Sequence, residues 1–336
     1  MKHHYCTLFD SFYLSRGLAL IDSLKRLDPD FSILIFAMDD LSAKVLLSLQ
    51  DSALVVKTKA DLEDAELLSV KDSRSIAEYC WTCTPKTILY ALQVLNWEHC
   101  TYIDADIYFF SNPAPLFDRV ENILLVPHRF SNEFSRLTEA GKYCVQFNFF
   151  RNNTEALKAL IWWKDACIAW CFDRYEDGKF GDQKYLDDWT ERFSGVLSLS
   201  HEGGGLAPWN LAQYEVCGSE ENQNLEIKKN SAEVRWPVVF YHFHALKFYT
   251  KNRIQLGRFQ FPKNVIQQIY SPYIRKLWSI EKNLVQKWGA SGYQQSFKSE
   301  PVGLRHWLSR VRDRLRHKQH IYPISQFVGD TIAPAR

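Results

Sequence analysis

Two aspartates one residue apart, Asp104 and Asp106, follow an apolar run in the middle of the chain. The surrounding sequence reads CTYIDADIYFF over residues 100–110. On an extended strand, residues i and i+2 face the same way, so the two carboxylates can point at one cation. Burying paired charges among apolar residues is costly, and a divalent metal ion is the usual compensation. The pattern therefore predicts a metal site, and a bound diphosphate is the ligand that best explains one.

Two histidines and a lysine belong to a second apolar run, VVFYHFHALK at residues 238–247. On a strand, His242 and His244 share one face, and either imidazole could complete an oxygen-rich metal site. Mixed carboxylate and imidazole ligation suits Mn²⁺ somewhat better than Mg²⁺, so the expected cofactor is one of these two ions. Lys247 could meet a phosphate as a point charge. The alternative is that one histidine only fills the core or its rim.

A third polar cluster, Asp182 and Gln183, precedes the apolar residues of an expected helix at 185–189. The two side chains would stand at the N-terminal end of that helix, where Asp182 could simply act as a cap. A fourth segment, residues 201–210, contains three consecutive glycines. It predicts a mobile loop that could approach a ligand closely, or a flexible connector, because the spacing matches no phosphate-binding loop.

Other chemistry fits these residues less well. Asp104 could be the nucleophile of a haloacid-dehalogenase-type phosphatase, but such acid pairs normally lie on the first strand and precede a hydroxyl-bearing loop. Here the pair lies beyond residue 100 and runs into aromatic residues. Two solvated acids at a strand end are the simplest alternative. A zinc site is less favoured than core packing for two cysteine pairs far apart in the chain: Cys80, Cys83, Cys167 and Cys171.

The elements that must position these clusters alternate between strands and helices. Helical spacing predicts helices over 14–27, 42–50 and 154–172, and a further helix that begins at Thr84–Pro85. Apolar runs predict strands before Asp104 and over residues 5–10, 31–37, 53–57, 123–126, 144–150, 196–199 and 238–243. This alternation predicts an α/β fold, with a mostly parallel central sheet and helices on both faces. In such sheets ligands gather beyond the carboxyl ends of the strands, where several of the polar clusters fall.

The last part of the chain differs from the rest. Strand patterns cease after about residue 250, so we expect a main α/β domain at 1–250 and a helical, basic C-terminal region at 251–336. Residues 304–318 combine leucines at helical spacing with many arginines, which is typical of a helix that lies on an anionic membrane surface. A solvated helix packed on the domain fits equally well. No nucleic-acid-binding module accompanies the charge, so nucleic acid is not an expected partner.

Length and composition set the broad class. The chain has 336 residues, 46% of them hydrophobic and 24% charged, with a formal net charge of +2, as in an ordinary globular protein. Its first residues lead into a strand pattern without a secretory leader, and no apolar stretch approaches the length of a membrane span. Eight cysteines in such a chain indicate reduced thiols. We therefore expect a cytoplasmic protein that could contact the inner face of the membrane peripherally.

In their order along the chain, these clusters resemble the GT-A glycosyltransferases, most closely glycosyltransferase family 8 (lipopolysaccharide galactosyltransferases and glycogenin-like enzymes). The resemblance covers roughly residues 3–250: a first strand ending near Asp10, then TPK, YIDAD, a strand with FN, DQ before a helix, and a late histidine and lysine. It implies a GT-A fold and metal-dependent transfer of a sugar from a nucleotide-diphosphate sugar. The expected donor is a UDP-sugar, the expected acceptor a surface glycan or lipid-linked glycan, and the expected outcome retention.

The resemblance also implies roles for residues that would bind the donor. Thr7 and Asp10 are similar in position to first-strand residues that contact the nucleotide base and ribose. Lys86 and Lys247 are similar to basic residues that reach the diphosphate. Asp104 would contact the nucleotide and also bind the metal ion.

For the metal and the reaction, Asp104, Asp106 and His242 match the family's ligand set, and Asp182 and Gln183 match the catalytic pair that borders the reacting carbon. The chain departs from the family pattern at residues 147–150, FNFF, and around the late lysine, which leaves the choice between His242 and His244 open. A catalytically inert module that binds a glycan or nucleotide is the remaining alternative.

Overall fold

A mixed β-sheet forms the centre of the computed structural model, which describes residues 2–218, 224–230, 233–249, 252–262, 264–289, 297–298 and 320–329. Within these residues the sheet has seven strands, in the order β3 (Leu54–Thr58), β2 (Phe31–Ala37), β1 (His3–Phe9), β4 (His99–Ile103), β7 (Tyr143–Arg151), β6 (Ile123–Pro127) and β8 (Val196–Ser198). Strand β7 runs antiparallel to β4 and β6, while every other neighbouring pair is parallel. The carboxyl ends of β1, β4 and β6 therefore meet at one edge.

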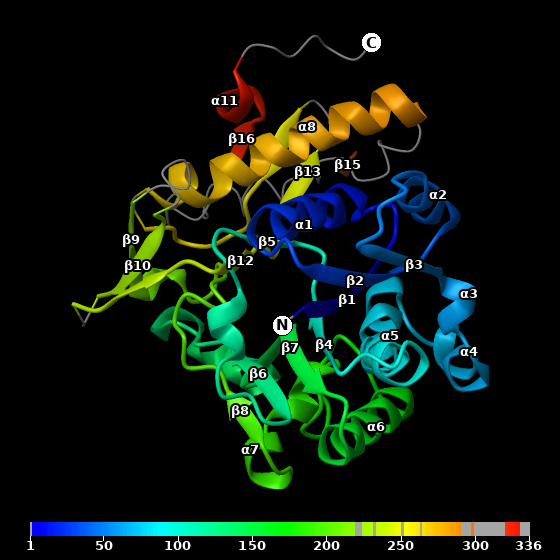
Figure 1. The fold of residues 1–336 in the computed structure, drawn as a ribbon. Helices are drawn as coiled ribbons and strands as arrows, with labels where there is room; N and C mark the ends of the chain where they lie inside the picture. The colour runs from blue at the N-terminus through cyan, green and yellow to red at the C-terminus, as the bar shows by residue number, and fades with distance from the viewer. Residues whose placement is uncertain are drawn as a thin grey trace.

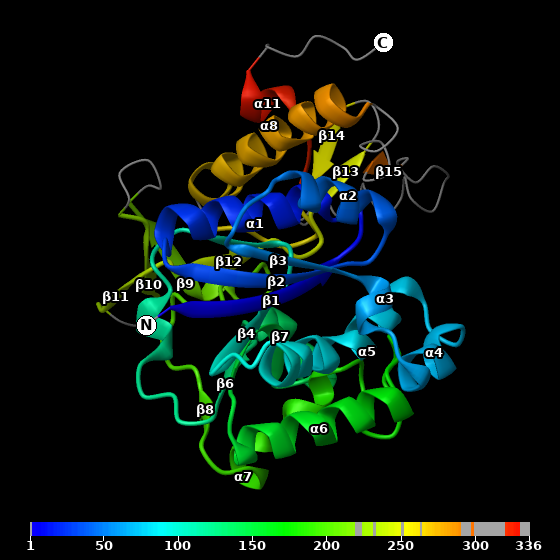
Figure 2. The same ribbon diagram turned by 45° about the vertical axis from the view of Figure 1, so that its right-hand side comes forward.

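Helices cover both faces of this sheet, as Figures 1 and 2 show. Helices α1 (Leu14–Leu27) and α2 (Asp40–Ser48) share one hydrophobic core with the sheet, and α5 (Ile76–Leu89) and α6 (Thr154–Ala169) share another. The short helices α3 (Lys59–Leu62), α4 (Ala65–Lys71) and α7 (Trp189–Arg192) complete this part. The predicted α/β fold, mostly parallel with helices on both faces, is confirmed.

Helix α5 begins eight residues earlier than the sequence pattern predicted, at Ile76 instead of Thr84. Ser75 caps the helix and forms a capping box with Glu78, which satisfies backbone donors at the true start. Pro85 lies inside the helix, and the element continues as a π-helix at Tyr90–Val94. The proline that was interpreted as a first-turn residue is therefore an interior one.

The two acids lie in a turn, and not on a strand as the alternation argument assumed. Strand β4 ends at Ile103, and β5 (Ile107–Phe109) begins after Asp106. The Ile107 amide donates to the Asp104 carbonyl over 3.1 Å and closes the turn. Strand β5 then pairs antiparallel with β12 (Phe240–His242), so the second apolar run lies against the acid turn.

Helix α8 (Ser271–Trp288) packs the C-terminal part of the chain against α1. The two helices lie side by side in both views (Figures 1 and 2). Beyond the predicted boundary at residue 250 the described chain also contains strands, which the helical expectation did not include. Strands β13 (Lys247–Tyr249), β14 (Arg253–Gln255), β15 (Phe297–Lys298) and β16 (Ile321–Pro323) form one small sheet, followed by α11 (Ser325–Val328). Another small sheet contains β9 (Tyr214–Cys217), β10 (Glu226–Lys229) and β11 (Arg235–Pro237). The predicted membrane-binding segment, residues 304–318, lies outside the described residues.

Among the described helices, none has the length and apolar character that a membrane span requires.

Candidate metal centre

Backbone hydrogen bonds fix the acid turn from two sides. The Asp104 amide donates to the Gln146 carbonyl on β7 over 3.0 Å, and the Phe243 amide, just after β12, donates to the Asp106 carbonyl over 3.0 Å. The turn is thereby tied to both the large sheet and the β5–β12 pair. Since β4 is a central strand, the acids stand at the carboxyl edge of the sheet.

Asp104, Asp106 and His242 form a three-residue cluster whose ligand atoms all lie within 4.8 Å of one another. His242 Nε2 is 3.1 Å from Asp106 Oδ1 and 3.8 Å from Asp104 Oδ2. Two donors bonded at right angles to one ion at roughly 2.1 Å lie about 3 Å apart, so these separations suit a divalent ion. His244 is exposed, and its ring centre is 5.7 Å from that of His242. Geometry therefore favours His242 as the imidazole ligand.

The two acids of this cluster differ in how readily they ionise. Burial raises the pKa of Asp104, and the neighbouring Asp106 adds to that rise although His242 opposes it. Burial also acts on Asp106, but the charge of His242 and the hydrogen bond from its ring outweigh it and lower the pKa of Asp106. A divalent cation would stabilise both carboxylates in their charged form. Two carboxylates and one imidazole, the donor set of this centre, fit Mn²⁺ or Mg²⁺.

Asp182 lies close to this cluster and is almost fully buried. Burial raises its pKa well above the ordinary value, and the charge of Asp104 raises it further. Its Oδ2 has no hydrogen-bond partner among the described residues, and its side chain caps nothing there at the start of the short 3₁₀ helix Gln183–Leu186. The interpretation of Asp182 as a plain helix cap is therefore wrong. Gln183 donates through Nε2 to the Ala140 carbonyl over 3.0 Å.

The end of β1 brings Thr7 and Asp10 to the same edge of the sheet. Thr7 is fully buried, and its hydroxyl lacks a hydrogen-bond partner in the described part of the chain. Asp10 follows the strand directly and accepts from the Phe12 amide over 3.0 Å. Burial raises the pKa of Asp10, and the nearby Asp39 adds to the effect. Whether these residues contact a nucleotide stays a prediction.

The two predicted lysines occupy different surroundings. Lys86, on α5, forms an ion pair with Asp64 at the start of α4. Both residues lie outside the acid turn. Lys247 is exposed at the start of β13, and its charge reaches His244. Their contacts with a diphosphate stay predictions.

Arg16, which the sequence reasoning did not select, also lies near the cluster. It is buried on the first turn of α1, and its charge reaches Asp106. The guanidinium donates to the Phe12 carbonyl over 3.2 Å and to the Leu246 carbonyl over 3.0 Å. It therefore ties α1 to the turn that separates His242 from Lys247. No local pattern marks this arginine, because its partner lies 230 residues away.

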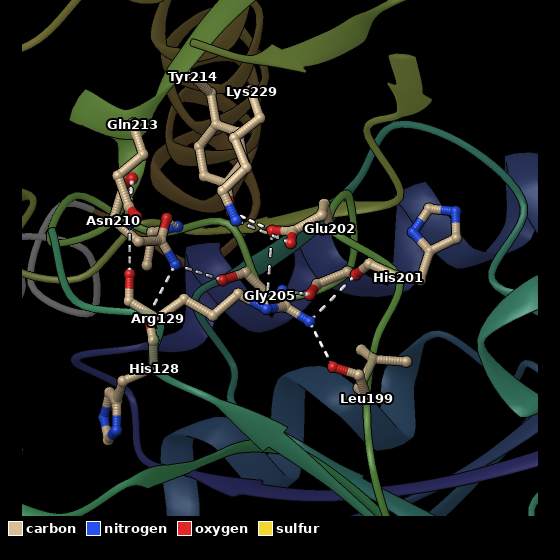
Figure 3. A network of polar contacts seen from close by, with 12 residues as sticks. His128, Arg129, Leu199, His201, Glu202, Gly205, Asn210, Gln213, Tyr214 and Lys229 are labelled. Carbon is tan, nitrogen blue, oxygen red and sulfur yellow. Dashed lines mark hydrogen bonds and ion pairs between the residues drawn. The ribbon is translucent and has the colours of Figure 1, made fainter. Parts of the chain in front are cut away.

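The glycine-rich segment is fixed in place, in contrast to the mobile loop or flexible connector that we expected. Arg129 donates to the Gly204 carbonyl over 2.8 Å. It also donates to the Leu199 carbonyl over 2.6 Å, as Figure 3 shows. A Cβ atom on Gly203 would come within 1.9 Å of the Pro237 carbonyl oxygen, so this glycine allows a close backbone approach. All three glycines are buried. Because glycine has no side chain, the segment can pack tightly against its neighbours.

This segment delivers Trp209 to the metal cluster. The indole donates to the His128 carbonyl over 3.0 Å. Asn210 donates to the same carbonyl and to that of Gly205, as Figure 3 shows. The Trp209 ring lies 5.4 Å from the His242 ring, at 90° to it. Trp209 was not among the predicted site residues, because no local sequence pattern links it to His242.

The four cysteines considered for zinc are free thiols, and three of them are core residues between the sheet and α5 or α6. They form no candidate metal cluster among the described residues. The preference for core packing agrees with this arrangement.

No family model matches the chain. The chain is 31% identical to YfnF of Bacillus subtilis (strain 168), an uncharacterized protein, over 268 residues that make up 76% of this chain and 85% of YfnF. The chain belongs to the YfnF family. YfnD of the same organism, also an uncharacterized protein, is 28% identical over 284 residues, which are 82% of this chain and 88% of YfnD.

Solved structures of several glycosyltransferases are similar to this YfnF-family chain. Galactosyltransferase LgtC, in complex with donor and acceptor sugar analogs, matches 82% of this chain and 95% of its own, with 12% identity and a TM-score of 0.49. Mouse xyloside xylosyltransferase 1 matches 73% and 98%, with 12% identity and a TM-score of 0.45. GlyE of Streptococcus pneumoniae TIGR4 has a TM-score of 0.41 and 13% identity over 61% of this chain, which spans about half of GlyE, 47%.

The described part of this chain combines an α/β fold with an Asp-Asp-His cluster that could hold a metal ion.

Proposed function

We propose that the protein is a metal-dependent glycosyltransferase that moves a sugar, as a hexosyltransferase, from a UDP-sugar to a glycan or lipid-linked acceptor. The cluster of Asp104, Asp106 and His242 at the carboxyl edge of the sheet is the observation that carries the proposal. Ligands of α/β sheets collect at that edge. Two acids and an imidazole are suited to an ion that binds a diphosphate.

In the proposed reaction, the bond from the anomeric carbon to the diphosphate oxygen breaks and a bond to an acceptor hydroxyl oxygen forms. The acceptor proton passes to the released nucleoside diphosphate, and the expected outcome is retention. A bound divalent ion would offset the charge that develops on the leaving diphosphate. Arg16 and Lys247 would add positive charge, and Asp182 with Gln183 would border the donor sugar.

The remaining parts of the proposal concern partners and location. Thr7, Asp10 and Lys86 are proposed to contact the donor. We keep the division at residue 250 and a cytoplasmic location with peripheral membrane contact through residues 304–318 as proposals, with surface polysaccharide synthesis as the setting.

The direct test is release of nucleoside diphosphate from a panel of UDP-sugars by the purified protein. We expect release with Mn²⁺ or Mg²⁺ and none in excess EDTA. Asp106→Ala should lower the rate by about 100-fold or more, because it removes a ligand of the ion that stabilises the leaving group.

Asp72→Ala is the matched control, since Asp72 is an exposed acid at the end of α4, outside the cluster. It should leave the rate unchanged. Full activity in EDTA would contradict the proposal. Release of inorganic phosphate from a simple phosphomonoester would instead favour Asp104 as a phosphatase nucleophile, and nucleotide binding without turnover would favour an inert binding module.

A further inference from the structure

Gln146 contacts both parts of the metal cluster, the acid turn and His242. It lies on β7 with no exposed surface. Its backbone carbonyl accepts from the Asp104 amide over 3.0 Å, and its side-chain Oε1 lies 2.7 Å from Nδ1 of His242. One residue thus contacts the acid turn through its backbone and the imidazole through its side chain.

The chemistry of this contact decides which ring nitrogen faces the acids. An amide oxygen can only accept a hydrogen bond, so Nδ1 of His242 must carry the proton. Nε2, which lies 3.1 Å from Asp106 Oδ1 and 3.8 Å from Asp104 Oδ2, is then the nitrogen that a metal ion would bind in place of its hydrogen bond to Asp106. The reverse amide orientation would require Nδ1 as acceptor and put the proton on Nε2, where it would block the ion.

Packing around the pair holds the imidazole in this orientation. The Trp209 ring stands perpendicular to that of His242 at 5.4 Å. On the far side, a Cβ atom on Gly205 would lie 3.4 Å from Nε2 of Gln146, and Gly205 has a positive φ of +97°. The amide therefore occupies a closely fitted space beside the glycine segment.

The same glutamine carries an energetic cost that packing does not explain. Its Nε2 is buried and makes no hydrogen bond to any described residue. Leaving a buried donor unpaired is destabilising. An apolar side chain of similar length would avoid this cost, so the geometry indicates that the oxygen of the amide is needed.

We propose that Gln146 is a positioning residue that holds His242 with Nε2 toward the divalent ion. This inference rests on the proposed function, because it presupposes that the cluster binds a metal. Hydrogen-bond partners of metal-binding histidines commonly contribute about 10- to 100-fold in metal affinity.

The test is titration of the purified full-length protein with Mn²⁺, without nucleotide, by calorimetry and by the electron paramagnetic resonance signal of free Mn²⁺. Gln146→Met, which keeps the length of the side chain but has no amide oxygen, should weaken binding by about 10- to 100-fold. Gln146→Glu keeps an acceptor oxygen and should bind at least as tightly as the unmodified protein. Thr101→Val is the control, a buried change on β4 at a hydroxyl without a partner among the described residues.

A folded Gln146→Met protein with unmodified Mn²⁺ affinity would overturn the inference. If Gln146→Met does not fold, Gln146→Glu decides, since loss of binding in that variant would also overturn it. Asp106→Ala distinguishes failure of the proposed role of Gln146 from failure of the proposed metal centre. If Asp106→Ala also binds normally, the metal centre and the proposed function fail together; if Asp106→Ala alone loses binding, only the role of Gln146 fails.

Discussion

At the scale of single residues, Arg16 shows how a buried charge can serve a site without being a ligand. Its guanidinium lies 4.8 Å from the centre of the Tyr13 ring and 5.8 Å from that of Phe248. Within the described chain it forms no ion pair with a carboxylate, so its direct contacts are with carbonyl oxygens and aromatic faces, while Asp106 feels its charge at a longer distance. A diphosphate beside Asp106 would be a suitable counter-charge.

We predict that Arg16→Leu weakens the binding of UDP in the presence of Mn²⁺ by about tenfold. The change removes the buried charge and releases the Leu246 carbonyl, so the turn before Lys247 loses its contact with α1. Calorimetric titration with UDP at saturating Mn²⁺ measures the effect.

Arg26→Leu is a matched control for that measurement. Arg26 lies on the same helix, donates to the Phe109 carbonyl over 3.5 Å and stacks over Tyr108 at 5.7 Å. Its loss should leave the affinity for UDP unchanged. Equal losses in both variants would assign the effect to the stability of α1 and not to the site.

At the scale of elements, some boundaries follow from local pattern and others do not. The predicted helix at 14–27 and the predicted strand at 31–37 have the bounds that the structure shows. Both have clear local causes: apolar residues at helical spacing in the helix, and an unbroken apolar run in a strand covered on both faces. In α5, by contrast, a proline typical of a helix start lies in the interior, and the capping box at Ser75 was overlooked.

The sequence predicted which residues form the site, but not the contacts that hold them in position. Asp104, Asp106 and His242 carry a recognisable pattern, and the structure brings them together. The contacts that hold them come from remote segments, such as Gln146 on β7, 96 residues from His242. Arg129 lies 75 residues from Gly204 in the chain and 70 from Leu199, and no local pattern links it to either. Such long-range contacts are determined by packing, which local periodicity does not encode.

At the scale of the whole molecule, the C-terminal part contributes to the fold of the first 250 residues. The rings of Tyr108 on β5 and Tyr273 on α8 lie 5.4 Å apart, and α8 shares a core with α1. Basic composition after residue 250 suggested a helical extension, but hydrophobic residues of α8 and the small sheet lie in that shared core. We therefore expect stability to depend on the chain beyond residue 250.

Stability should also depend on pH through His99, at the end of β4 opposite to Asp104. Both ring nitrogens are buried and unpaired within the described residues. Burial, followed by the charges of His4 and His3, lowers the pKa of His99 from 6.5 to about 4. Below pH 6.5 the unfolded chain therefore binds a proton that the folded chain refuses, so stability is lost as the pH falls from about 6.5 to 4.

We predict that His99→Phe reduces this loss, because phenylalanine does not titrate and can stack on Phe149 as the imidazole does, at 5.3 Å. Between pH 8 and pH 5, the free energy of unfolding should fall by about 2 kcal/mol less in the variant than in the unmodified protein. Urea unfolding at both pH values measures the difference. The same fall in both proteins would show that His99 does not control this pH response.

The central claim is that Asp104, Asp106 and His242 hold a divalent ion that binds a nucleoside diphosphate. Calorimetric titration of the protein with UDP, in Mn²⁺ and then in excess EDTA, tests it most directly. We predict measurable binding in Mn²⁺ that disappears in EDTA and in Asp106→Ala. Equal affinity for UDP with and without the metal ion, or undiminished binding by Asp106→Ala in Mn²⁺, would contradict the claim.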